Sequence, residues 1–207
     1  TGRQALEISQ QDSGLEDLQA EALKVIGQNL VAIGQVDEAI DNLTRALERY
    51  QQLDYTNNVA KTSLDLGLAF VSAGGYNQAH KAYQQALRMA ETLGDVFEQA
   101  TLLNNMAVLH HLTGDYPQAG STFEEALQLT EKTGYTRVRP YILARIGDLY
   151  ADLAAQEPAQ SAYQKARRAA GMNQDRFLLT YLDIAQAAQE RRYGRLAGSK
   201  ELLSAAE

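Results

Sequence analysis

The chain has no cysteine and no tryptophan, and only 3 of its 207 residues are proline. The absence of cysteine excludes disulfides and cysteine-ligated metal, although it does not fix the cellular compartment. Because proline breaks helical interiors, its scarcity permits long helices. No apolar run approaches the roughly 18 residues of a membrane span, and no signal peptide is recognisable at the start. We therefore expect a soluble, cytoplasmic protein without membrane contact.

The charge balance is acidic, with a formal net charge of −7 and an isoelectric point near 5.0. This balance argues against a nucleic-acid partner. Residues 1–159 carry a net charge of −10, whereas residues 160–207 carry +3. An ordinary solvated helix surface explains the difference. The alternative is a modest basic end around Arg191, Arg192 and Arg195 that meets an acidic partner.

One pattern of small residues recurs every 40 residues. The first small column is Gly27, Gly67, Ala107, Gly147 and Ala187. Two later columns are Ala39, Ala79, Ala119, Ala159 and Ser199, and Ala46, Ala86, Ala126, Ala166 and Ala206. A large residue stands four positions before the last column, at Leu43, Tyr83, Phe123, Tyr163 and Leu203. Between the first two columns come Gly34, Gly74, Gly114, Ala154 and Gly194. Such self-similarity at a fixed period is typical of stacked structural repeats.

Each repeat is interpreted as a hairpin of two antiparallel helices. Helices approach closely only where side chains are small, and the large residue fills the adjacent groove. The glycine between them can adopt positive φ at the end of the first helix. One hairpin cannot bury its apolar face alone, so neighbouring hairpins are expected to stack around a continuous core.

This pattern resembles the tetratricopeptide repeat family from Leu15 to Glu207, with motifs such as GGYNQAHKAYQQAL and GDYPQAGSTFEEAL. The resemblance implies an all-α, right-handed superhelical solenoid of four clear hairpins, a weaker fifth and an N-terminal half-repeat. The period exceeds the common 34 residues. It is more similar to the long repeats of kinesin light chains, polarity adaptors and bacterial regulators. The weaker fifth copy carries Asp183, Gln186 and Glu190 where most other copies are apolar or aromatic.

A single array is expected over residues 1–207. Residues 1–13 resemble the tail of a preceding helix, so the chain is either a fragment or begins with a half-repeat cap. The five hairpins are predicted at residues 15–53, 56–93, 95–133, 136–170 and 174–206. Asp95 and Glu98 have the spacing of a capping box. Pro117 suits the first turn of a helix, and Pro140 limits how early the fourth hairpin begins.

The resemblance implies that the first helix of each hairpin lines a concave groove. The binding candidates in its columns are Lys24, Gln28, Asp65, Asn104, Asn105, His111, Tyr141, Arg145 and Asp148, together with Lys61, Asp152, Tyr181 and Arg191. The central group is Asn104, Asn105 and Arg145. Asparagine both donates to and accepts from a peptide backbone, and the arginine fork suits carboxylates. The alternative is that these side chains only bond neighbouring helices, with Arg145 paired to Asp148 or Asp65.

A chaperone-tail carboxylate clamp is not expected. Asn105 and Arg145 match two of the five clamp columns of that branch of the family. The other three columns hold Leu64, Leu68 and Tyr141 instead of lysine or asparagine. A different mode of peptide binding remains open.

No cofactor, metal or catalytic group is predicted. His110 and His111 are adjacent and point about 100° apart on a helix, so they do not share one ion. His110 aligns with Leu30, Phe70 and Tyr150 and is expected to pack, whereas His111 is expected to be exposed. The chain shows no serine–histidine–aspartate or paired-carboxylate arrangement, and no phosphate loop.

Three functions remain open. The first is a non-enzymatic scaffold that binds a protein or peptide in the concave groove. The second is a sensor or regulatory segment of a larger bacterial regulator. The third is self-association into a homo-oligomer through uncapped end repeats, because solenoid ends expose apolar faces unless they are capped.

Overall fold

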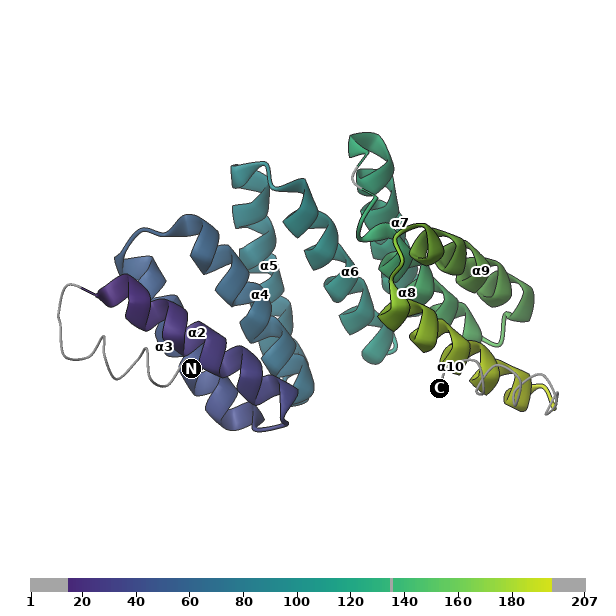
Figure 1. Ribbon diagram of the computed structural model, residues 1–207, viewed down its shortest axis with the longest axis horizontal. Coiled ribbons are helices and arrows are strands. Elements are labelled where there is room, and N and C mark those ends of the chain that lie inside the picture. Colours follow the sequence, from purple (N-terminus) through teal and green to yellow (C-terminus); the bar gives the residue numbers. More distant parts are fainter. Residues whose placement is uncertain (1–14, 135, 195–207) are drawn as a thin grey trace. The chain divides into compact units, whose positions relative to one another are not determined.

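The computed structural model describes residues 15–134 and 136–194, and within these ranges every regular element is an α-helix. The chain divides into two compact units, Thr1–Leu109 and His110–Glu207. Figure 1 shows the helices of each unit running back and forth as hairpins. The prediction of an all-α array of helical hairpins is confirmed.

The helices follow the 40-residue period. In the first unit, α2 (Glu16–Ala32) pairs with α3 (Val36–Gln52), and α4 (Thr56–Ser72) pairs with α5 (Tyr76–Leu93). Helix α6 (Val96–Leu112) contains the boundary between the units. The second unit continues with α7 (Tyr116–Thr133), α8 (Arg139–Asp152), α9 (Gln156–Met172) and α10 (Arg176–Arg192). The expected helix tail at residues 1–13 and the second helix of the fifth hairpin lie outside the described residues.

The small columns are the places where the two helices of a hairpin meet. A Cβ atom added to Gly147 would lie 2.4 Å from Cε1 of Tyr163, and one added to Gly67 would lie 2.3 Å from Cε1 of Tyr83. Both distances are far shorter than a normal carbon–carbon contact. The ring of the second helix therefore occupies the volume that a side chain on the first would need, as the sequence pattern predicted.

Two sets of turns join the helices, and the sequence pattern identified only one of them. Within the hairpins, Gly34, Gly74 and Gly114 have positive φ, and Ala154 has the same left-handed backbone with φ 56°. Between the hairpins, left-handed residues recur at the same period, at Asp54, Gly94, Gly134 and Gln174. The second column was not predicted from the sequence, because Asp54 and Gln174 interrupt its glycines.

Aspartates and prolines mark several helix starts. Asp95 accepts a hydrogen bond from the Glu98 N–H at 3.0 Å, as the spacing predicted, and Asp115 and Asp175 cap α7 and α10 in the same way. Helix α8 starts at Arg139, immediately before Pro140, and is the shortest described helix at 14 residues. The late start agrees with the limit expected from Pro140, which lies in the first turn, where its missing N–H leaves no intrahelical hydrogen bond unmade.

The polar residues of the fifth copy have a partner that the sequence pattern did not reveal. Asp183 is buried, and Arg167 of α9 donates to its carboxylate at 2.5 Å and to the Gln186 side-chain oxygen at 2.8 Å. Helix α10 therefore packs on α9 through a bridging guanidinium, whereas three of the other four copies have a leucine at the position of Asp183.

Candidate functional site

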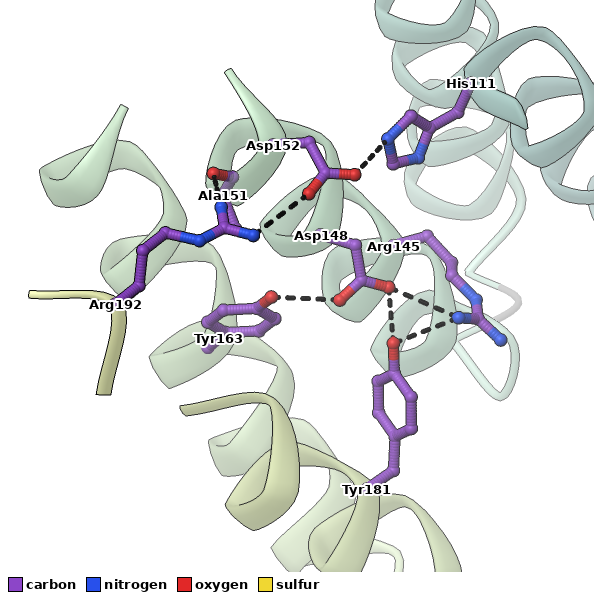
Figure 2. A network of polar contacts seen from close by, with 8 residues as sticks. All are labelled: His111, Arg145, Asp148, Ala151, Asp152, Tyr163, Tyr181 and Arg192. Carbon is purple, nitrogen blue, oxygen red and sulfur yellow. Dashed lines mark hydrogen bonds and ion pairs between the residues drawn. The ribbon is translucent and has the colours of Figure 1, made fainter. Parts of the chain in front are cut away.

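Asp148 is the centre of a polar network in the second unit (Figure 2). One carboxylate oxygen accepts a hydrogen bond from the Tyr163 hydroxyl at 2.9 Å. The other accepts from the Tyr181 hydroxyl at 2.5 Å and from Nη1 of Arg145 at 3.2 Å. Arg145 also donates to the Tyr181 oxygen at 3.0 Å. We call these four residues the Asp148 network; they join α8, α9 and α10.

The Asp148 network keeps its tyrosines protonated and its arginine fixed. Burial and the charge of Asp148 raise the pKa values of Tyr163 and Tyr181, so both hydroxyls remain hydrogen-bond donors. The guanidinium of Arg145 lies 5.1 Å from the centre of the Tyr181 ring, a cation–π distance. Its side chain is nevertheless 45% exposed. An arginine held in this way can still donate outward.

A second cluster lies next to this network on α8. Asp152 contacts Nε2 of His111 at 3.0 Å and Nη2 of Arg192 at 3.7 Å, and Arg192 also donates to the Ala151 carbonyl oxygen at 2.6 Å. The His111 ring meets the Tyr116 ring edge at 5.8 Å. The expectation that His111 is exposed was wrong, since its side chain is only 15% exposed. The ring is covered because it packs between an acid and an aromatic residue.

A cavity of about 320 Å³ opens between α8 and α10 beside these side chains. Its lining includes Asp148, Asp152, Tyr163, Tyr181 and Arg192. Several polar groups of the second unit therefore converge on one concave space between neighbouring first helices. Such a cavity with a few fixed polar groups is typical of binding sites.

Tyr141 lies at the N-terminal end of α8 and does not join the Asp148 network. Its hydroxyl donates to Asp175, the residue that caps α10. This hydrogen bond, together with burial, raises the pKa of Tyr141. The Tyr141 side chain remains partly exposed, at 37%.

In the first unit the predicted candidates form pairs within and between first helices. Lys24 contacts Glu21 at 2.8 Å, and the Tyr50 hydroxyl donates to the same carboxylate at 2.6 Å. Gln28 of α2 donates to Asp65 of α4 at 2.7 Å. Burial raises the pKa of Asp65, although the hydrogen bond from Gln28 opposes that rise.

Asn104 and Asn105 lie on α6 in the first unit. Asn104 is buried, and its side-chain oxygen has no hydrogen-bond partner among the described residues. Its amide nitrogen lies 3.5 Å from the Asn105 side-chain oxygen, which is a weak contact. An unpaired buried carbonyl oxygen costs free energy, so Asn104 is the candidate with an unused acceptor.

The predicted central group is distributed over both units. Asn104 and Asn105 belong to the first unit and Arg145 to the second. The pairing of Arg145 with Asp148 was foreseen as the alternative interpretation, and the structure contains it. The role of these candidates in binding stays a prediction.

Sequence reasoning missed three contributors to these clusters. Tyr163 was assigned only to packing, and Arg192 only to a basic end. The partner of Tyr141, Asp175, was not considered. A signal was present for Arg192, because it stands 40 residues after Asp152. Residues in the same column of adjacent repeats are expected to lie side by side, and here they form an ion pair.

Two absences concern only the part of the chain that the structure describes. There, His, Asp and Glu side chains do not gather in the groups of three or more that a metal ion needs. No helix in the same ranges combines the length and apolar character needed to cross a membrane.

The repeated helical hairpins define a class of proteins, the helical-hairpin repeat scaffolds. A family model described as tetratricopeptide repeat matches residues 18–92 and 98–171. These stretches cover more than half of the sequence, and the chain belongs to the tetratricopeptide repeat family. A search of curated proteins found no match.

Solved structures share the fold at low sequence identity. Aspartyl phosphate phosphatase F from Bacillus subtilis is 17% identical with a TM-score of 0.77, over 90% of this chain and 50% of that chain. A Rap protein complexed with competence and sporulation factor is 17% identical with a TM-score of 0.78, over 94% and 55%. Kinesin light chain repeats from Podosopora anserina are 13% identical with a TM-score of 0.66, over 90% and 92%. The chain thus spans about half the length of the first two proteins.

Proposed function

We propose that this chain is a non-enzymatic scaffold that binds a protein or peptide segment against the first helices of its hairpins. Family membership supports the general role of protein interaction, and the particular surface is our inference. The observation that carries it is the Asp148 network beside its cavity. There, polar side chains from three helices are held in place before any partner arrives.

Arg145 is the group that would meet the partner. A guanidinium carries five N–H donors, and the hydrogen bonds to Asp148 and Tyr181 both use Nη1. The remaining donors suit a carboxylate or a backbone carbonyl of a bound segment. Because the network already orders the side chain, binding would cost less conformational entropy than binding by a free arginine.

Asn104 and Asn105 would serve the same purpose in the first unit. The Asn105 amide can donate to a backbone carbonyl. The unused oxygen of Asn104 is buried, so the Asn104 side chain would have to rotate outward to accept a backbone N–H. Lys24, Gln28, Asp65, His111, Tyr141 and Asp148 complete the proposed contact set around these groups. A partner that supplies an N–H to Asn104 would remove the cost of its unpaired oxygen.

The test is affinity capture from a lysate of the source organism, with captured proteins identified by mass spectrometry. The baits are the unaltered chain, Arg145→Ala, Arg145→Lys, and the double variant Asn104→Ala with Asn105→Ala. Arg45→Ala is the control, since it removes an exposed arginine from the second helix α3. Circular dichroism checks that all baits are folded.

We expect to capture a partner whose affinity falls by about tenfold or more in Arg145→Ala. A loss of this size corresponds to one charged hydrogen bond. Arg145→Lys should not restore binding, because lysine lacks the planar fork. The Arg45→Ala bait should capture the partner normally. Equal capture by all baits would reject the first-helix surface as the binding site.

The second candidate is a sensor or regulatory segment of a larger bacterial regulator. The Rap protein of the same fold was solved in complex with competence and sporulation factor, and this chain covers only 55% of it. The native gene tests this idea. A reading frame that encodes an adjoining signalling or DNA-binding domain would support it, and one limited to these residues would reject it.

The third candidate is self-association, and we place the chain in the cytoplasm. Self-association rests on the apolar side chains of α10, where Phe177 is 78% exposed and Ile184 51% exposed. Sedimentation velocity over a wide concentration range tests it. A monomer at the highest concentration would reject self-association.

A further inference from the structure

A groove along the second helices of the second unit lies away from the Asp148 network. Helix α8 forms its floor, and α7 and α9 form its walls. The floor residues Leu143, Ile146, Tyr150 and Leu153 are spaced three or four apart, so they share one face of α8. Arg145, Asp148 and Asp152 fall on another face of the same helix.

The groove consists of two adjoining cavities. A cavity of about 560 Å³ lies towards the start of α9, and one of about 360 Å³ lies towards its end. Leu143 and Lys165 line both cavities, so the two adjoin at these side chains. The α9 wall extends from Pro158 to Met172, which is roughly 21 Å of helix.

Gly120 on α7 keeps this groove open. A Cβ atom added there would find only Cδ2 of Leu149, at 3.9 Å. The equivalent residue 80 positions earlier is Ile40, which packs on Leu66 and Ala69 of α4. The α3–α4–α5 groove of the first unit therefore has a large apolar side chain at this position, which Gly120 lacks, and the two copies between and after them hold His80 and Gln160.

The two ends of the groove differ in chemistry. Tyr116, Tyr150 and Leu153 line the larger cavity and are exposed apolar or aromatic side chains. At the other end lie Arg139, Lys165 and Arg168. Of these, Arg139 contacts Glu131 at 2.9 Å, whereas no ion pair of Lys165 or Arg168 occurs among the described residues.

The charge of the lining is opposite to that of the chain. The groove contains three basic side chains and one acidic residue, Glu124, a net charge of +2, while the whole chain carries −7. Two cations without an ion pair among residues 15–134 and 136–194, beside an apolar floor, suit a ligand that is acidic at one end and apolar along the rest.

We propose that this groove docks an amphipathic helix of a partner protein, with its apolar face on α8 and acidic residues against Lys165 and Arg168. Helix-in-groove binding matches the dimensions, because about 14 helical residues span the same 21 Å. The surface is independent of the first-helix site proposed above. Either proposal can fail without the other.

The probe is a displayed library of helical peptides of about 14 residues, with random side chains on one face, selected on the folded chain. Two variants alter the groove: Gly120→Ile fills it, and the double variant Lys165→Glu with Arg168→Glu reverses its charge. The matched control is Lys81→Glu with Arg88→Glu on α5, which changes the net charge equally and includes the register equivalent of Arg168.

Enriched peptides should combine apolar residues at positions i, i+3, i+4 and i+7 with acidic residues at one end. Fluorescence anisotropy should show at least about tenfold weaker binding to each groove variant, and unchanged binding to the control. Added salt should weaken binding to the unaltered chain. Arg145→Ala should bind these peptides normally, which separates this groove from the first-helix site.

Several results would overturn the proposal. They are the absence of any enriched peptide, enrichment of basic or proline-rich extended peptides, and equal binding to the Gly120→Ile variant. Sedimentation provides a further check. If the unaltered chain self-associates and Gly120→Ile does not, the occupant is a second copy of this chain rather than a partner helix.

Discussion

At the scale of single residues, burial makes the ionisation of Glu98 less favourable in the folded chain. The side chain is only 8% exposed, and burial raises the pKa of its carboxyl above the ordinary value. The negative charge of Asp95 raises the pKa further, and Lys61 opposes it. The folded chain therefore binds this proton more tightly than the unfolded chain does.

This difference predicts a pH-dependent effect of Glu98→Gln. The stability contributed by a group with a raised pKa is present below its ordinary pKa and is lost as the pH rises through the raised value. At neutral pH the charged Glu98 thus opposes folding. We expect Glu98→Gln to unfold at higher urea concentration at pH 7, with the gain vanishing towards about pH 4.

Urea titrations of both chains between these pH values would measure the effect. The control is Glu91→Gln, because Glu91 is exposed on α5 of the same unit. A gain that is independent of pH would contradict the role of burial.

Glycines of the same helical conformation have opposite roles in this fold. Gly147→Ala would place a carbon 2.4 Å from the Tyr163 ring. Tyr163 is fixed by its bond to Asp148, so the ring cannot move aside freely. We expect the second unit to lose about 1–3 kcal/mol of unfolding free energy from overpacking.

Gly120→Ala is the matched control, since its new carbon would make only one ordinary contact, with Cδ2 of Leu149 at 3.9 Å. Alanine there should stabilise the unit by about 0.5–1 kcal/mol through lower chain entropy. Chemical denaturation of both variants would compare them. Equal effects would show that close helix contact does not decide the glycine column.

At the scale of helices, α10 depends on a guanidinium from α9. Asp183 is buried where Leu23, Leu103 and Leu143 stand in other copies. Arg167→Met would leave that carboxylate without its partner. We expect a loss of about 1–3 kcal/mol, in the range for an unsatisfied buried group.

The double variant Arg167→Met with Asp183→Leu should recover most of this loss, since an apolar pair can replace a buried ion pair. Thermal unfolding followed by circular dichroism measures both changes. If the double variant is no more stable than Arg167→Met alone, the buried carboxylate is not the cause of the loss.

At the scale of the whole molecule, stability should be local. In a repeat array each hairpin contacts mainly its neighbours, and stability is close to a sum of repeat and interface terms. We therefore expect Gly147→Ala to raise amide hydrogen exchange in α8 and α9, with little change in α2 and α3. Exchange mass spectrometry measures this directly. An equal rise throughout would show that the two units unfold as one.

The helical hairpins could be predicted from the sequence, whereas some of the turns between them could not. The hairpins, their glycine turns and the contact of Gly147 with Tyr163 follow from the 40-residue period, since short-range geometry forces small residues where helices touch. The turns at Asp54 and Gln174 were not predicted, because any residue can be strained into the left-handed region when packing holds it there.

The sequence by itself determined an all-α repeat array. Only the tertiary structure decided the hydrogen-bond partners of the candidate polar residues. Asp148 is joined to Tyr163 and Tyr181, 15 and 33 residues away, and Gly120 opens a groove that Ile40 fills in the first unit. The physical reason is that the 40-residue period determines the arrangement of the backbone. The hydrogen-bond partners of long polar side chains depend instead on the distances between neighbouring helices.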